Sequence, residues 1–239
     1  MNNMPTYVSV IIPAFNEDAR IEHCLDTVSS YLATQDYSWE VIVCNDGSTD
    51  RTSELVRRFV KIDSRINLID LLHQGKGSAV RAGMLKAEGE VRILCDADFS
   101  MPVEHISRLI HAGYSYDIAI ASRELPDSRR FNEPQRRHFM GRVFNYLTRL
   151  LILPGIMDSQ CGFKLFNQSS AKELFQDLNV SGFAFDVEIL AKARKHNFSI
   201  TEVPIDWYYF EGSKVRILRD SIGMFKDLMK LRIKYNRIR

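Results

Sequence analysis

The chain has 239 residues, of which 45% are apolar, so it can bury a substantial core, and we expect one domain. Its 32 lysines and arginines nearly balance its 30 acidic residues. The net charge of +2 therefore gives no reason to expect a nucleic-acid partner. The four cysteines are widely spaced and form no CxxC pair, which argues against a zinc site or a disulfide framework and favours reduced cytoplasmic thiols.

The hydropathy of the chain does not predict a membrane span. No apolar stretch approaches the roughly 18 residues that a span needs. The first residues also lack the basic start and the long apolar core of a signal peptide. Any contact with a membrane is therefore expected to be peripheral.

Short apolar runs alternate with amphipathic segments through the first half, which predicts a mostly parallel sheet with helices on both faces. Strands are expected at 8–12, 39–44, 66–71, 91–95 and 117–121, and helices at 21–32, 50–60, 78–86 and 103–111. The second half is less regular, with an amphipathic segment at 135–153, a helix at 185–195, a strand at 200–209 and a basic C-terminal helix.

Two carboxylates, Asp96 and Asp98, stand at the end of the fourth predicted strand. Ligands of such sheets bind beyond the carboxyl ends of the strands. The spacing of two places both side chains on one side if the extended geometry persists. Paired carboxylates suit Mg²⁺ or Mn²⁺, whose remaining ligands are water and phosphate oxygens. An acidic pair in a solvated loop is the alternative interpretation.

Residues 45–50 (NDGSTD) follow the second predicted strand. They predict a turn and a helix start, with Gly47 in an unusual backbone conformation and Ser48, Thr49 or Asp50 capping the helix. Asp46 could also accept a hydrogen bond from a nucleotide base or a ribose hydroxyl.

The segment 75–78 (GKGS) looks like a phosphate loop but does not meet its pattern. A Walker loop needs a glycine five residues before the lysine, where Leu71 stands, and a serine or threonine directly after it. The segment still predicts a helix start that favours phosphate.

Three segments, 8–17 (VSVIIPAFNE), 45–50 and 96–98 (DAD), occur in an order and spacing that resemble the inverting glycosyltransferases of family 2, which have the GT-A fold. Further matches resemble the dolichyl-phosphate β-glucosyltransferases within that family and, more distantly, the dolichyl-phosphate mannose synthases. These matches lie at 75–81, 158–166, 183–188, 202–205 and 212–214. The resemblance covers most of the chain.

The resemblance implies roles for particular side chains. It places Pro13, Phe15, Glu17, Asp46, Asp96, Ala97 and Lys214 at the donor, Asp96, Asp98 and Ser100 around a metal ion, and Asp98, Arg123 and Asp158 at the reacting groups. Arg123 and Lys214 would contact phosphates. Mannose synthases carry Gln at the position of Ser100, and Asn45 replaces a frequent Asp, so the donor sugar and the metal geometry stay open.

The activity expected from this resemblance is metal-dependent transfer of a sugar from a nucleotide diphosphate donor, UDP-glucose, to a polyprenyl phosphate. Such an acceptor needs cations more than a base, because its second pKa of about 6 leaves it largely dianionic. The chain offers Arg123, Arg129, Arg130, Arg136 and Arg137.

Two alternative functions stay open. One is a soluble family 2 enzyme that acts on a hydroxyl with Asp158 as general base, although Asp158 could equally cap a turn. The other is a nucleotide-sugar-binding module without turnover. The oligomeric state is not determined by the sequence.

Two segments bear on membrane contact. An apolar helical stripe, which core packing could also explain, consists of Phe139, Met140, Val143, Phe144, Leu147, Leu150 and Leu151. Between Arg216 and Arg239, eight basic and two acidic residues give a local charge of +6, suited to an anionic surface, a solvated tail or an oligomer contact. We expect a cytoplasmic protein, peripheral at the membrane face. Its domain would span 1–215, with a donor half (1–122) and an acceptor half (123–215), followed by a basic helix (216–239).

Overall fold

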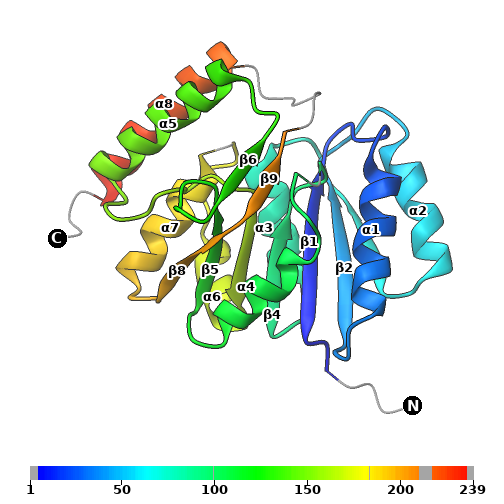
Figure 1. The fold of residues 1–239 in the computed structure, drawn as a ribbon. Helices are drawn as coiled ribbons and strands as arrows, with labels where there is room; N and C mark the ends of the chain where they lie inside the picture. The colour runs from blue at the N-terminus through cyan, green and yellow to red at the C-terminus, as the bar shows by residue number, and fades with distance from the viewer. Residues whose placement is uncertain (1–4, 99, 183, 210–216, 236–239) are drawn as a thin grey trace.

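The computed structural model describes residues 5–98, 100–182, 184–209 and 217–235, with the backbone alone for 217–222. Its centre is a seven-stranded sheet in the order β3-β2-β1-β4-β7-β5-β8 (Figure 1). The strands are β1 (Val8–Ala14), β2 (Trp39–Asn45), β3 (Ile66–Asp70), β4 (Val91–Cys95), β5 (Ile118–Ser122), β7 (Phe163–Asn167) and β8 (Ile200–Pro204). All neighbours pair in parallel except β7, which runs antiparallel between β4 and β5.

The helices cover both faces of this sheet, as the apolar strands predicted. They are α1 (Ile21–Ala33), α2 (Thr52–Ile62), α3 (Lys76–Lys86), α4 (His105–Gly113), α5 (Gln135–Leu151), α6 (Gln168–Gln176), α7 (Phe185–Lys195) and α8 (Ile217–Tyr235). Successive side chains of β1 alternate between two cores, because Val10 and Ile12 pack with α1, α2 and α4, whereas Ile11 packs with α3, α6 and α7. The predicted α/β architecture is confirmed.

The second half contains elements that the sequence did not predict. The strand β7 was missed because its apolar run is interrupted by Lys164, which is buried in the structure with 1% of its surface exposed. The helix α6 and the short strand β6 (Arg129–Phe131) were also missed. The single strand predicted at 200–209 is wrong in its extent, because the chain leaves the sheet at Ile205 and forms β9 (Asp206–Tyr208), which pairs with β6.

Helices α5 and α8 lie side by side at one end of the sheet (Figure 1), where Arg232 Nη1 donates to the Leu151 carbonyl at 2.6 Å. On α8, Leu228 and Leu231 are buried in the core that α7 helps to form. The apolar stripe of α5 is divided: Phe144, Leu147 and Leu151 pack against that core, whereas Phe139, Met140, Val143 and Leu150 are exposed. In the part of the chain described here, no helix is both long and apolar enough to cross a membrane.

The four cysteines are buried and free. Burial raises the pKa of the Cys44 and Cys161 thiols to about 12, which keeps them protonated and unreactive at neutral pH.

Candidate active site

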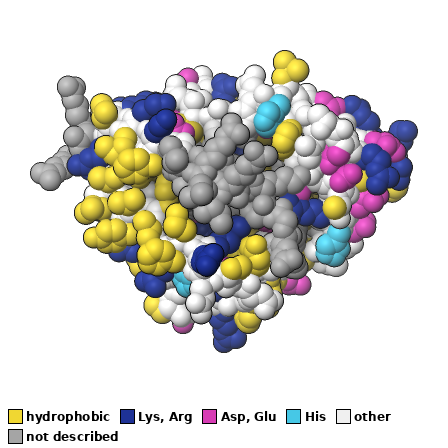
Figure 2. All heavy atoms as spheres, turned by 90° about the horizontal axis from the view of Figure 1, so that it is seen from above, with side chains coloured by type: hydrophobic (Ala, Val, Ile, Leu, Met, Phe, Trp, Pro, Cys, Tyr) yellow, Lys and Arg dark blue, Asp and Glu magenta, His cyan; other side chains and the backbone are white. Residues whose placement is uncertain are grey.

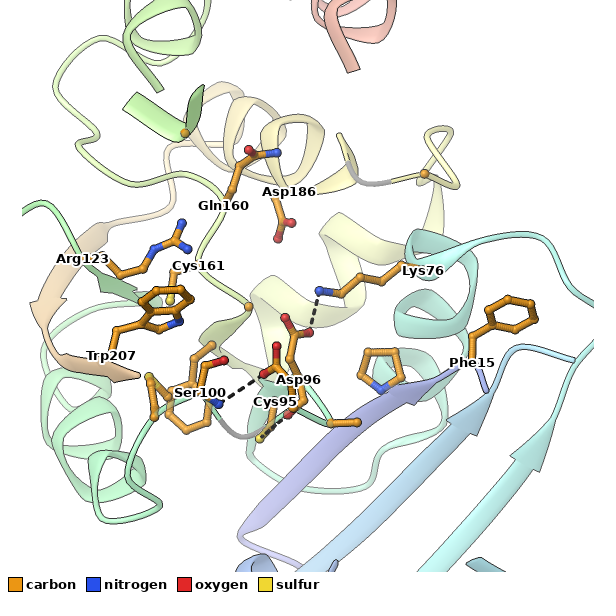
Figure 3. Close-up of a pocket in the computed structure, with 18 of the residues that line it drawn as sticks. Phe15, Lys76, Cys95, Asp96, Ser100, Arg123, Gln160, Cys161, Asp186 and Trp207 are labelled. Carbon is orange, nitrogen blue, oxygen red and sulfur yellow. Dashed lines mark hydrogen bonds and ion pairs between the residues drawn. The ribbon is translucent and has the colours of Figure 1, made fainter. Parts of the chain in front are cut away.

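A cavity of about 810 Å³ lies beyond the carboxyl ends of β1, β2 and β4, where the strand order predicted the ligand site (Figure 3). Its wall contains Pro13, Phe15, Glu17, Asp46, Asp96, Ala97, Asp98, Ser100 and Arg123, which were all predicted as site residues. Asp158 is buried behind this wall, and Lys214 lies outside the described residues.

One end of the cavity is aromatic. The ring of Phe15 stacks on that of His73 with 4.1 Å between their centroids. Asp46 holds the loop that carries His73, because its carboxylate accepts from the backbone N–H groups of Gln74 and Gly75, each at 2.9 Å. The sequence suggested that Asp46 binds a base or a ribose, and in this structure its oxygens already bind the loop that forms the wall.

Gly47 allows this loop to approach Asp46. It has a φ of +68°, which is the unusual conformation expected at this turn, and a Cβ added here would lie 2.8 Å from the His73 backbone nitrogen. Asp50 accepts from the Thr52 N–H at 2.9 Å and so binds the first turn of α2, but the N-cap residue is Arg51, which makes no side-chain cap hydrogen bond, and the predicted cap is therefore wrong.

The acidic pair lies at the floor of the cavity. The strand β4 ends at Cys95 and the following segment turns, yet Asp96 and Asp98 both reach the cavity wall. Burial, and then the charge of Asp96, raise the pKa of Asp98, while the N–H of Ser100 donates to it at 3.2 Å. Lys76 Nζ lies 2.5 Å from Asp96 Oδ1 and partly balances the pair.

These oxygen ligands fit Mg²⁺ or Mn²⁺. Among the described residues no group of three acidic, His or Cys side chains could enclose a metal ion. Two carboxylates nevertheless match the way Mg²⁺ binds in nucleotide sites, where water and phosphate oxygens complete its coordination. Burial is the main cause of the raised pKa of Asp98, and a bound cation would relieve the repulsion from Asp96 that adds to it.

Gly162 leaves the space that the Asp96 carboxylate occupies. It lies in the segment that leads into β7, and a Cβ added to it would lie 1.8 Å from Asp96 Oδ2. Only glycine leaves room for the carboxylate here, so an antiparallel strand that the sequence did not predict helps to shape the acidic floor.

The opposite wall carries an ion pair. Arg123 Nε and Nη2 donate to the two Asp158 oxygens at 2.6 and 2.9 Å, and the Arg123 backbone N–H adds a third bond at 3.1 Å. Asp158 is 0% exposed. Burial opposes its charge, but Arg123 outweighs burial and lowers the pKa of Asp158 to about 2.

Other arginines divide into two groups. Arg130 and Arg137 line the cavity beside Arg123, whereas Arg129 and Arg136 are exposed and lie outside its wall. Arg130 pairs with Glu124 at 2.5 Å and with Glu133 at 2.7 Å, so its single positive charge already faces two carboxylates.

The residues that line or shape the site without a role assigned from the sequence include His73, Lys76, Gly162, Asp186 and Trp207. Lys76 belongs to the GKGS segment, which was predicted as a helix start that favours phosphate, without a role for the lysine itself. Asp186 and Gly162 lie inside segments that resemble the family, but such a match does not say which side chain faces the cavity.

A family model described as Glycosyl transferase family 2 matches residues 9–175 of this chain. The chain belongs to glycosyl transferase family 2. This glycosyltransferase is 34% identical to the dolichyl-phosphate beta-glucosyltransferase of Dictyostelium discoideum, over 96% of this chain and 75% of the relative. It is 32% identical to the enzyme of the same name from Homo sapiens, over 95% of this chain and 75% of the relative.

Solved structures establish the fold of this glycosyltransferase. The glucosyl-3-phosphoglycerate synthase of Mycobacterium tuberculosis in complex with UDP gives a TM-score of 0.72 at 18% identity, over 98% of this chain and 81% of that one. A complex of the same synthase with Mn²⁺, UDP and glucosyl-3-phosphoglycerate gives 0.68 at 16% identity, over 94% of this chain and 77% of that one. The GT-A fold that the family resemblance implied is confirmed.

Proposed function

We propose that this glycosyltransferase transfers glucose from UDP-glucose to a polyprenyl phosphate, with Mg²⁺ or Mn²⁺ held by Asp96 and Asp98. The observation that carries the proposal is that one cavity joins this acidic floor to a wall with Arg123, Arg130 and Arg137. The curated relatives, named as dolichyl-phosphate beta-glucosyltransferases, support the same pairing of sugar and acceptor. Membership of a transferase family favours an enzyme over the non-catalytic binding module.

The donor would lie along the first half of the chain. Phe15 and His73 offer a stacking wall for the base, and Glu17 and Asp46 border it. The diphosphate would lie near Lys76 at the N-terminus of α3, where the helix dipole favours an anion. A divalent ion at Asp96 and Asp98 would neutralise charge as UDP leaves. The protein's own part is to position these groups before the reaction.

The acceptor would meet the arginine wall. A lipid monophosphate is already largely dianionic at neutral pH, with a second pKa of about 6, so it needs positive neighbours and no general base. Asp158 is a weak base in this structure, because its pKa is about 2 and both its oxygens bind Arg123. Asp158 is therefore better placed to hold Arg123 in position than to remove a proton, which favours the phosphate acceptor over the hydroxyl alternative.

The exposed apolar side chains of α5 and α8 would face the membrane. They are Phe139, Met140, Val143 and Leu150 on α5 with Phe225, Met229 and Ile233 on α8. Figure 2 shows apolar side chains gathered at one end of the upper face, with Lys and Arg side chains at its margins. An apolar patch rimmed by cations is typical of an interfacial surface.

We further propose that the protein lies at the cytoplasmic face of the membrane. Residues 1–122 act as the donor half, 123–215 as the acceptor half and 216–239 as the basic helix that contacts lipid. A polyprenyl phosphate is anchored in the bilayer, so an enzyme that lies on the surface meets the phosphate where the arginine wall opens.

The test of the reaction is transfer from radiolabelled UDP-glucose by purified protein, with Mn²⁺ or Mg²⁺ and with or without a polyprenyl phosphate in detergent. We expect an organic-extractable product that requires the lipid, disappears with a chelator and is lost in Asp98→Ala. Asp26→Ala removes an exposed carboxylate of α1 outside the cavity and should keep full activity. Metal-dependent UDP binding without any lipid product would contradict the proposed acceptor.

The test of the membrane surface is flotation with anionic vesicles. Phe139 and Leu150 are 67% and 64% exposed, and replacing both with Asp should reduce binding at least tenfold by burying two charges at the interface. Ile62→Asp is the control, because Ile62 is 85% exposed but lies at the end of α2. Equal flotation of the two variants would contradict this surface.

A further inference from the structure

We infer that Asp186 recognises the sugar of the donor, with its carboxylate accepting hydrogen bonds from hexose hydroxyls and with Lys164 as its buried anchor. This assignment rests on the proposed nucleotide-sugar donor and adds a residue that selects the sugar. Asp186 comes from the first turn of α7, far in the sequence from the acidic pair.

Asp186 is held rigidly at the wall of the cavity. It is 4% exposed and borders the cavity, and its Oδ1 accepts from Lys164 Nζ at 2.6 Å. Lys164 lies on β7 and also donates to the Cys161 carbonyl. The ion pair therefore joins β7 to α7 and fixes the carboxylate from behind, which is the support that a precise binding group needs.

The second oxygen of Asp186 is available to a ligand. Among the described residues, Lys164 is the hydrogen-bond donor to Oδ1 and none donates to Oδ2. Burial raises the pKa of Asp186, although the charges of Lys164 and Lys76 counteract the effect. Asp186 Oδ2 is not among the buried side-chain atoms that lack a partner, so this oxygen is open to the cavity, where the hydroxyl donors of a ligand could reach it.

The location of Asp186 corresponds to the sugar of a bound donor. In Figure 3, Asp186 and Gln160 lie across the cavity from Asp96, with the Lys76 ammonium between the two carboxylates. Burial disfavours that ammonium, but Asp96 and then Asp186 outweigh burial and raise the pKa of Lys76. With the base at Phe15 and the diphosphate at Asp96, the sugar extends beyond the diphosphate toward Asp186.

The chemistry of this wall selects a neutral polyol. Sugar hydroxyls are hydrogen-bond donors that match a carboxylate, and a charged hydrogen bond of this kind strongly disfavours an analogue that lacks the hydroxyl. A second phosphate would be repelled by Asp186. The cavity thus separates a cationic wall for the acceptor phosphate from an acidic wall for the sugar.

The experiment compares UDP with UDP-glucose by titration calorimetry in the presence of Mn²⁺, for the wild type and Asp186→Asn. The amide keeps the size of the side chain and weakens the acceptor. We expect UDP affinity to change less than about twofold and UDP-glucose affinity to fall roughly 10- to 100-fold. Asp177→Asn is the matched control, an exposed carboxylate near the end of α6 that should leave both affinities unchanged.

Analogues of UDP-glucose that lack the 3-, 4- or 6-hydroxyl identify the contact. Removing the hydroxyl that Asp186 binds should weaken wild-type binding and cause no further loss in Asp186→Asn, as a double-mutant cycle requires. Equal weakening of UDP and UDP-glucose in Asp186→Asn, or additive losses with all three analogues, would overturn the inference and leave the proposed donor intact. Absence of metal-dependent UDP binding in the wild type would overturn the proposed donor and the inference together.

Discussion

Gly162→Ala adds one methyl group to a segment that supplies none of the proposed metal ligands. The new Cβ would lie 1.8 Å from Asp96 Oδ2, whereas ordinary contact begins near 3.4 Å. The carboxylate or the 160–163 segment must therefore shift by about 1.6 Å. A displacement of about 1 Å at a reacting centre can cost 100-fold in rate, so we expect kcat/KM to fall at least about 100-fold.

The fold should survive this substitution. Overpacking of this kind costs about 1–3 kcal/mol, which is less than the usual stability of a domain. The measurements are the transfer rate, the Mn²⁺-dependent affinity for UDP and the midpoint of urea unfolding. Gly223→Ala is the control, because a Cβ at this exposed position of α8 meets nothing within 4 Å and should add about 0.5–1 kcal/mol of stability.

A Gly162→Ala protein with wild-type rate and UDP affinity would refute the assignment of Gly162 as the residue that positions Asp96. If the variant lost activity only because it unfolds, its urea midpoint would be strongly lowered. Retained folding with lost metal-dependent binding is the result that the geometry requires.

Three further predictions concern pH and stability. Because burial and an acidic neighbour raise the pKa of Asp98, Mn²⁺ affinity measured by calorimetry should weaken as the pH falls from neutral, at a higher pH than an ordinary aspartate would cause, and a flat profile would contradict this. The lowered pKa of Asp158, about 2 against an ordinary 3.8, gives stability that is complete above the ordinary value and lost as the pH falls toward 2. The difference in unfolding free energy between the wild type and Asp158→Asn should therefore shrink by about 2 kcal/mol over that window, and a constant difference would argue against the ion pair. Lys234→Met leaves buried Glu188 without the ammonium that lies 2.9 Å from it, and the free energy of unfolding in urea should fall by about 1–3 kcal/mol. The control is Lys230→Met, which should cost under about 0.5 kcal/mol because the Lys230 side chain is 79% exposed. Equal costs would refute a stabilising ion pair between α7 and α8.

The role of Asp158 is less simple than the sequence suggested. Asp158 was expected to act alone, either as a base or as a turn cap. In the structure it holds Arg123 through a buried, bidentate ion pair, so the loss of its carboxylate also displaces a cation of the acceptor wall. Removing one partner of such a pair is typically costly, at about 3–5 kcal/mol. Reduced activity in Asp158→Asn would therefore not by itself establish a general base.

The first half of the fold and the donor end of the site could be predicted from the sequence. Short apolar runs alternate with helical segments from Val8 to Ser122, and the polar segments after β1, β2 and β4 must meet at one edge of a parallel sheet. The positions of Phe15, Asp46 and Asp96 in one cavity follow from that local rule.

In the second half the sequence predicted α5, α7 and the start of β8, whereas β6, β7, α6 and the wall of the cavity opposite the donor end depend on tertiary contacts. The strand β7 contains a lysine in the middle of its run, and this position becomes favourable only when α7 supplies Asp186 to the same buried space. Gly162 is required because the segment before β7 passes directly over Asp96. Contacts between residues so distant along the chain leave no periodic signal in the sequence. The sequence therefore could not predict which of these side chains meet in the cavity.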